Sequence, residues 1–244
     1  MEKVNIGDIK ISGSGTASGG KYNEVCISGS GKINGDLDCV VFKTSGSSKV
    51  IGNLKAETIK ISGAAHIEGN VEAEEIKVSG SSHIIGNVKS QSTKINGSTH
   101  IVGNLYGEEA SITGSVNIEK DCEVEHFKAS GSFKIQGLLN AEEVTINIGG
   151  KCLVKEIGGE HIEVRNGIID SFFFKKVIDK MFNSKGELTT ELIEGDEIYL
   201  ENTNAKIVRG NNVTIGDGCN IGLIEYRGEI NVSSESIVKE QKQI

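Results

Sequence analysis

The stretch TIKISGAAHIEGNVEAE, residues 58–74, is followed directly by EIKVSGSSHIIGNVKSQ, residues 75–91, and the two align without a gap. Each carries one glycine at its sixth position and another at its twelfth. The first glycine recurs every 17 residues, as Gly29, Gly46, Gly63, Gly80, Gly97, Gly114 and Gly131. The second recurs as Gly35, Gly52, Gly69, Gly86, Gly103 and Gly137, with Lys120 in its place once. Self-similarity at a fixed period indicates a repeat architecture, here from about Glu24 to Leu139.

Four columns of residues recur between the glycines with the same period. The first three are apolar and contain Ile33, Val50, Ile67, Ile84, Ile101, Ile118 and Ile135; Leu37, Leu54, Val71, Val88, Leu105, Cys122 and Leu139; and Ile27, Thr44, Ile61, Val78, Ile95, Ile112, Ala129 and Ile146. The fourth is small and contains Cys39, Ala56, Ala73, Ser90, Gly107, Val124 and Ala141. Apolar and polar residues alternate over short runs such as Ile59-Lys60-Ile61, which is typical of β-strands.

One turn of this length cannot bury its own apolar face. Stacked turns can, because each column becomes a ladder of like side chains about 4.8 Å apart. The sequence therefore predicts an all-β fold, a parallel β-helix solenoid with 17-residue turns. An antiparallel meander is excluded, because equivalent residues of antiparallel neighbours do not stack. The uneven spacing within a turn favours the right-handed form.

The repeat loses its period after Leu139, which divides the chain. We expect a β-helix over residues 1–168, an amphipathic helical linker or cap over 169–187, a short second β-helical stack over 188–238 and a frayed tail over 239–244. In the second stack, Ile207 and Ile224 are 17 residues apart, and Arg209 and Arg227 each precede a glycine. This spacing predicts equivalent corners for the two arginines.

Residues 171–186, SFFFKKVIDKMFNSKG, differ from the repeats and predict a short helix that begins at Ser171 and ends at Gly186. Its apolar residues fall at helical spacing, and lysines surround them. Three roles are open: a cap on the β-helix, a helix on a membrane surface and a helix that binds a partner. Each role would use Phe172, Phe173, Phe174, Val177, Ile178, Met181 and Phe182.

Composition excludes several classes of protein. The 244 residues include 32 glycines and no proline, which excludes proline-rich and collagen-like chains. The net charge of −8 argues against a nucleic-acid partner. No apolar run is long enough to span a membrane or direct secretion, which predicts a cytoplasmic protein, with a peripheral position at the inner face of the membrane as a further option. The dispersed Cys26, Cys39, Cys122, Cys152 and Cys219 indicate free thiols.

No motif indicates an enzyme or a cofactor. The chain has no G-x-S-x-G nucleophile motif and no phosphate-binding loop, and its gapless turns leave no long loops to wall a substrate groove. His66, His83 and His100 recur at the repeat period, each before an inward isoleucine, so they should stack on the outer surface. Stacked imidazoles can bind a transition metal, but no further ligand lies nearby in the pattern. We expect an exposed histidine column and no metal site.

Other outward columns are charged or amidic. The charged columns contain Lys43, Lys60, Lys77, Lys94 and Lys128, and Glu57, Glu74, Glu108, Glu125 and Glu142. Such columns either keep solvent-exposed faces from associating or form a docking surface for a partner. Asparagines follow the second glycine as Asn53, Asn70, Asn87 and Asn104. We expect these residues to supply left-handed corners and hydrogen bonds along the stack.

The ends of a β-helix expose unpaired strand edges, which template further strands. Because the first turn begins almost at Met1, the predicted self-assembly site contains Val4, Ile6, Ile9 and Ile11. Ile9 and Ile11 should align with Val25 and Ile27 of the next turn. The predicted partner is a second copy of the chain, in a homo-oligomer or filament that needs no nucleotide.

The unit S-G-S-x-x-I-x-G-x-[LV], present as SGSGKINGDL at 28–37 and SGSSHIIGNV at 79–88, resembles the bactofilins, polymer-forming bacterial cytoskeletal proteins. The resemblance covers about residues 5–165. It implies a right-handed β-helix that polymerises without a nucleotide, often at the membrane, and scaffolds cell-envelope or appendage machinery. The chain lacks the usual proline-rich tails and apolar targeting peptide, and it carries the extra region 171–244. Since a second stack can cap one end, a monomeric or dimeric adaptor that does not polymerise is the alternative.

Overall fold

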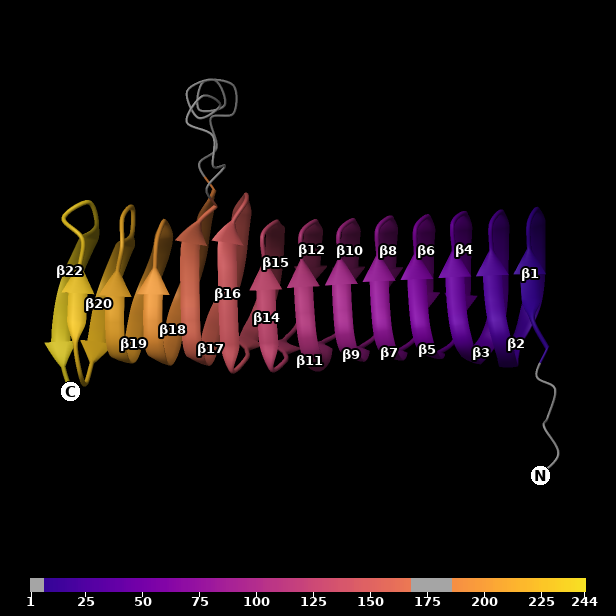
Figure 1. Cartoon of the computed structure of the whole chain (residues 1–244), viewed down its shortest axis with the longest axis horizontal. Coiled ribbons are helices and arrows are strands. Elements are labelled where there is room, and N and C mark those ends of the chain that lie inside the picture. Colours follow the sequence, from indigo (N-terminus) through magenta and orange to yellow (C-terminus); the bar gives the residue numbers. More distant parts are fainter. Residues whose placement is uncertain (1–6, 168–185) are drawn as a thin grey trace, which may run out of the picture. The chain divides into compact units, whose positions relative to one another are not determined.

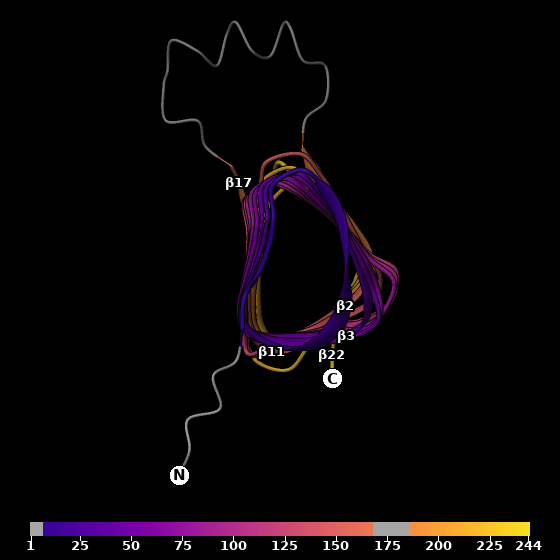
Figure 2. The same cartoon turned by 90° about the vertical axis from the view of Figure 1, so that its right-hand side faces the viewer.

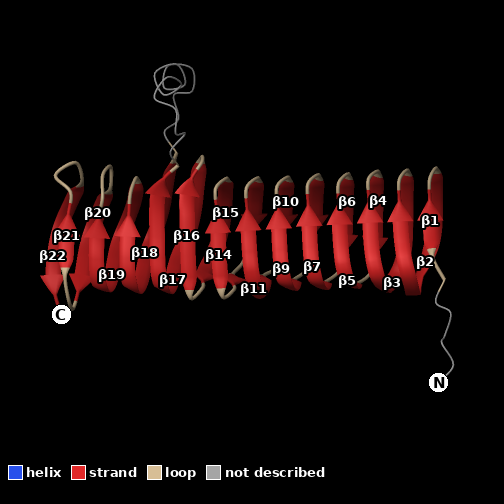
Figure 3. Ribbon diagram, viewed as in Figure 1, coloured by secondary structure: helices blue, strands red, loops and turns tan. Residues whose placement is uncertain are grey.

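The computed structural model describes residues 7–167 and 186–244. These residues form 22 β-strands and contain no helix (Figure 3). They fall into two compact units, Met1–Val124 and Glu125–Ile244, and each unit is a parallel β-solenoid (Figure 1). The predicted all-β parallel solenoid is therefore confirmed. The helix predicted for residues 171–186 lies outside the described residues, apart from Gly186.

The first unit reproduces the repeat as stacked parallel strands. Its strands are β1 (Ile9–Ile11), β2 (Ser14–Ile27), β3 (Ser30–Thr44), β4 (Ser47–Ile51), β5 (Leu54–Ile61), β6 (Ala64–Glu68), β7 (Val71–Val78), β8 (Ser81–Ile84), β9 (Val88–Ile95), β10 (Ser98–Ile101), β11 (Leu105–Ile112), β12 (Ser115–Ile118) and β13 (Cys122–Glu123). In β6, β8 and β10, Ile67 pairs with Ile84 and Ile84 with Ile101, as the period predicts. Viewed from the N-terminal side, the turns of this unit lie over one another (Figure 2).

The core of the first unit contains the predicted columns and two that were not recognised. In the first predicted column, from Ile33 to Ile118, every side chain is at most 3 % exposed. The additional inward columns contain Val25, Phe42, Ile59, Ile76, Thr93 and Ala110, and Ser48, Ala65, Ser82, Thr99 and Val116. The buried hydroxyls of Ser82 and Thr99 form a hydrogen bond of 3.0 Å, so their burial costs little.

The strict glycine period comes from the close approach of successive turns. A Cβ atom on Gly63 would overlap the carbonyl oxygen of Gly46, and one on Gly80 would overlap that of Gly63. The turns can therefore stack at strand spacing only if glycine occupies this column. Gly52, in the second glycine column, has φ +139°, which residues with a Cβ rarely adopt.

The asparagines after the second glycine form hydrogen bonds along the stack, as predicted. The main-chain N–H of Asn70 donates to Oδ1 of Asn53 at 2.9 Å, and each later asparagine repeats the pattern. The predicted left-handed corners are wrong. Among the described non-glycine residues only Asn202 has a positive φ, of 43°, and Gly52 takes the positive φ in front of Asn53.

The second unit has less regular turns. Its strands are β14 (His126–Ala129), β15 (Ser132–Asn140), β16 (Glu143–Ile148), β17 (Lys151–Asn166), β18 (Glu187–Leu200), β19 (Thr203–Ile215), β20 (Asn220–Tyr226), β21 (Ile230–Val232) and β22 (Ile237–Gln243). The pairing of β15 with β17 shifts register between Ile135 and Leu138. Further along, β17, β18 and β19 stack in register: Ile162 pairs with Ile198, and Ile198 with Val213.

Two sequence alignments in the C-terminal strands are wrong. Ile207 pairs with Leu223, and the buried Val208 is the partner of Ile224. Arg209 pairs with Glu225 inside the strands, so Arg209 and Arg227 do not occupy equivalent corners. The turn that joins β19 to β20 is one residue shorter than the repeat, and this shifts the register.

The C-terminal residues also differ from expectation. The tail predicted to fray forms β22 as far as Gln243, and β22 pairs with β20 through partners such as Val238 and Ile221. Main-chain hydrogen bonds do not depend on the polarity of the side chains, so a polar segment can form the last strand of a solenoid.

Candidate self-association edges

The N-terminal edge is built by β1. Val4 and Ile6 of the predicted site lie outside the described residues. Ile9 and Ile11 pair with Val25 and Ile27, as predicted. Ile9 is 9 % exposed and Ile11 is half-buried. Within the described ranges, β1 pairs only with β2, so its other edge offers backbone donors and acceptors for a further strand.

The rest of the first turn presents small residues at the same end. Ala17 pairs with the fully buried Ile33 and is itself half-buried. A Cβ atom on Gly13 would meet nothing within 4 Å, whereas one on Gly29 would overlap the oxygen of Gly13. The glycine column that brings interior turns together thus ends in open space, next to the apolar Ile11.

The C-terminal edge is more polar. In β22, Gln241 pairs with the fully buried Ile224, so a polar side chain ends an apolar column. Lys239, Glu240 and Lys242 are exposed on the same strand. Ile237 remains 63 % exposed. The sequence analysis missed this edge, because a charged segment gave no strand signal; the apolar pair Ile237-Val238 was the only hint.

The histidine column is formed as predicted. The ring centroids of His66 and His83 lie 5.0 Å apart, and those of His83 and His100 lie 4.8 Å apart. Glu68 approaches His66 at 3.1 Å and also Lys49 at 2.7 Å. Desolvation, then the neighbouring histidines, lowers the pKa of His83 from its ordinary value. In the described part of the chain, no three His, Cys, Asp or Glu side chains are grouped to hold a metal ion.

The buried cysteines do not supply a nucleophile. Burial, with a smaller contribution from the charge of Asp38, raises the pKa of Cys39 to about 12. Burial raises the pKa of Cys152 to about 11, and it also raises that of Cys122 and Cys219. These four thiols therefore stay protonated near neutral pH, and a protonated thiol is a weak nucleophile.

The third predicted site was the segment with Phe172, Phe173, Phe174, Val177, Ile178, Met181 and Phe182. All seven residues lie outside the described ranges. Among the residues that are described, no helix has the length and apolar character needed to cross a membrane.

Comparison with known proteins covers the N-terminal part of the chain. Residues 3–89 match the family model for bactofilin, described as polymer-forming cytoskeletal. Two proteins of Bacillus subtilis (strain 168), both described as uncharacterized, are similar. YhbF is 41 % identical over 109 residues, 44 % of this chain and 42 % of YhbF. YhbE is 43 % identical over 99 residues, 39 % of this chain and 38 % of YhbE.

The chain thus spans about two fifths of the length of these curated relatives. No solved structure matches it. The matched range contains the gapless repeats and the open β1 edge, which are the features on which the resemblance was based. Over residues 3–89, the chain belongs to the bactofilin family.

Proposed function

We propose that this protein is a non-enzymatic scaffold that assembles with copies of itself, end to end and without a nucleotide. The observation that carries the proposal is the N-terminal edge, where the apolar columns of Ile9 and Ile11 end at a strand with one free side among the described residues. A second copy that docks there would pair the free backbone groups and cover the apolar ends. The family description, polymer-forming cytoskeletal, supports this assignment.

The scaffold reading extends to partners and location. From the bactofilin resemblance, we propose that the assembled protein organises cell-envelope or appendage machinery in the cytoplasm, at the inner face of the membrane. The right-handed sense of the solenoid belongs to the same expectation. Purification of the assembled protein from its own cells, with identification of membrane-associated partners, would test this part.

The variant Ile9→Lys tests the junction. A lysine in this column must stay solvated, so it opposes docking, while the interior turns depend only on their neighbours and stay folded. We expect a smaller species in light scattering with an unchanged circular dichroism spectrum. The matched control is Ser47→Lys, which adds the same charge at an exposed position of an interior turn. If Ile9→Lys assembles as readily as the parent, β1 is not a junction.

A second substitution probes the same end without a charge. Gly13→Ala adds one methyl group where no atom of the chain lies within 4 Å, so the fold should tolerate it. If a docking copy continues the close stacking of the turns, the methyl group obstructs it, and assembly should weaken. Equal assembly of Gly13→Ala and the parent would mean that the junction is not a continuation of the stack.

One observation favours the alternative, an adaptor that forms monomers or dimers. The polar β22, with Gln241 opposite Ile224, is the kind of strand that blocks addition of another. Negative-stain microscopy over a range of concentrations separates the two functions. Filaments that lengthen with concentration support the scaffold, whereas particles of one fixed size support the adaptor.

A further inference from the structure

A groove runs along one side of the first unit, away from both strand edges. Its floor follows the column of small residues, which includes Ala56, Ala73 and Ser90. These three side chains are at most 8 % exposed, so they leave a channel between the longer side chains on either side. Tyr22 pairs with Cys39, which places a large residue at the N-terminal end of the same column and closes the groove there.

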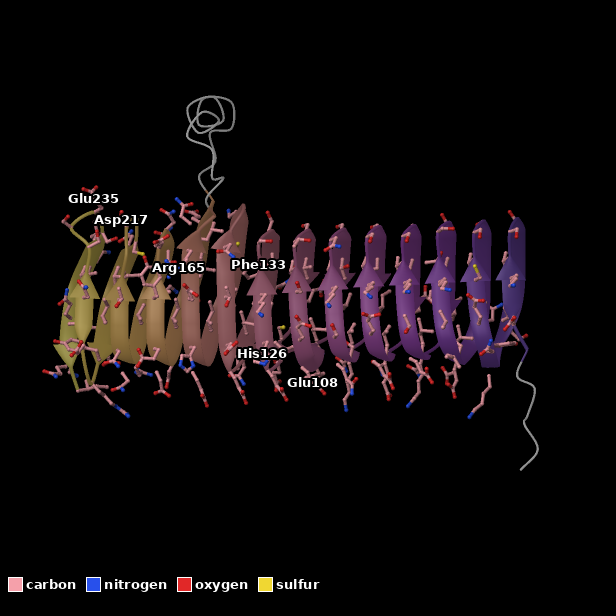
Figure 4. The ribbon with its side chains drawn as sticks, in the orientation of Figure 1. Glu108, His126, Phe133, Arg165, Asp217 and Glu235 are labelled. Atoms are coloured by element: carbon pink, nitrogen blue, oxygen red, sulfur yellow. The ribbon has the colours of Figure 1, made fainter. Side chains whose placement is uncertain are left out.

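The two walls of the groove have different charge. One wall alternates in sign and is neutralised internally, since Lys55 and Glu72 form an ion pair of 2.7 Å. On the other wall Glu57, Glu74 and Glu108 stand in one repeat column and are exposed. None of these three carboxylates forms an ion pair with any part of the chain that the structure describes. Figure 4 shows Glu108 projecting outward from the rim of the turns.

We propose that this groove binds an extended segment of a partner protein that carries lysine or arginine side chains. Five turns span about 24 Å at the strand spacing of about 4.8 Å, which is the length of about seven residues of extended chain. The unpaired carboxylates recur along this line at multiples of the turn spacing, so basic side chains on one side of an extended segment can meet them in turn. The small floor lets the backbone of the segment approach closely.

The binding can be measured with the full-length protein and a fluorescein-labelled peptide of four Lys-Ser repeats, by fluorescence anisotropy. We expect saturable binding that weakens as salt is added, because the attraction is between exposed charges. A peptide of four Glu-Ser repeats should not bind. Replacement of all three carboxylates, Glu57→Gln, Glu74→Gln and Glu108→Gln, should weaken binding of the lysine peptide about tenfold.

The matched control removes the same charge elsewhere, with Glu229→Gln, Glu235→Gln and Glu240→Gln, all of which are exposed. This triple variant should bind the peptide as the parent does. An equal loss in both variants would show an effect of net charge and overturn the groove. Absence of binding to the parent, or competition by spermine as strong as that by the unlabelled peptide, would overturn the assignment to a polypeptide. Light scattering on the same samples reports assembly separately, since the groove variant leaves β1 unchanged.

A charge-reversal variant provides a second readout. With Glu57→Lys, Glu74→Lys and Glu108→Lys, the groove should lose the lysine peptide and gain the glutamate peptide. If this variant is folded by circular dichroism and binds neither peptide more tightly than the parent, the three positions do not form the binding wall.

Discussion

The main-chain N–H of Asn87 donates a hydrogen bond of 2.9 Å to Oδ1 of Asn70, one turn earlier in the stack. The same bond connects Asn104 to Asn87, and Asp121 to Asn104. At the other end of the ladder, Oδ1 of Asp36 accepts from the N–H of Asn53 at 2.7 Å. A side-chain oxygen is therefore the common requirement of this column, and aspartate satisfies it as well as asparagine does.

Asn70→Ala removes the acceptor for Asn87, and we expect a loss of about 1 kcal/mol in the free energy of unfolding. Asn70→Asp keeps an oxygen at the same place and should remain close to the parent. Urea unfolding followed by circular dichroism measures both. Equal losses in the two variants would show that the ladder depends on the amide group and not on its oxygen.

Gly80→Ala should destabilise the first unit by at least about 2 kcal/mol, because the new methyl group would overlap the carbonyl oxygen of Gly63 and force the turns apart. Gly13→Ala is the control in the same column, since its methyl group meets nothing within 4 Å. Melting temperatures below the range of assembly compare the two. A Gly80→Ala protein as stable as Gly13→Ala would mean that the turns stack less closely than described.

Two adjacent isoleucines test the register of the core. Ile84 is 3 % exposed and lies between Ile67 and Ile101, whereas Ile85 is 43 % exposed. Ile84→Asp should cost more than about 4 kcal/mol, because it buries a carboxylate without a partner. Ile85→Asp should change the melting temperature little. The reverse order of the two melting temperatures would place the wrong residue of the pair in the core.

The sequence predicted the first unit well because one constraint acts on every turn. Where the overlap of Gly63 with Gly46 forbids any side chain, the period cannot drift, and a residue such as Ile84 is placed by counting. Glycine also concealed a detail: the positive φ at Gly52 removed the need for a left-handed Asn53. The column of Phe42 and Thr93 was overlooked because its residues share no type, only burial.

The second unit could not be predicted by counting, since its turns differ in length. One missing residue between β19 and β20 moved the partner of Ile224 from Ile207 to Val208. The C-terminal edge depends on main-chain hydrogen bonds of a polar strand, which leave no hydrophobic pattern. The groove was visible only as a column of small residues, because a hollow depends on the length of the side chains on both sides of Ala73.

The histidine column predicts a pH dependence of stability. The pKa of His83 is lowered in the folded state, so the unfolded chain binds a proton at this residue more readily. Its contribution is fully favourable above the unfolded pKa, about 6.5, and is lost as the pH falls toward the lower folded value. The other charged groups on this face are Lys49, Glu68 and Glu119, and the lowered pKa of Glu68 makes that carboxylate act at lower pH.

We therefore expect the urea midpoint to fall between pH 7.5 and pH 5.5, and His83→Asn to reduce this fall. Asparagine fits the column, since Asn117 pairs with His100 in the same position. His161→Asn, at an exposed position of the second unit, is the control and should keep the dependence of the parent. A slope that is the same in all three proteins would exclude the column as its source.

The polar C-terminal strand can be tested by adding to its apolar surface. Gln241 stands opposite Ile224 at the end of a column that is otherwise apolar, and the side chains of Ile221 and Ile224 are fully buried beneath β22. Gln241→Ile extends the column to the free edge, so this end should acquire an apolar surface that favours docking of a second copy. If β22 limits growth, the variant forms larger particles than the parent at equal concentration, by light scattering and negative-stain microscopy. Lys239→Gln is the control, because it removes a charge from the same strand without extending the column. Particles of Gln241→Ile that match those of the parent would show that β22 does not set the size of the assembly, and the adaptor alternative would lose the observation that favours it.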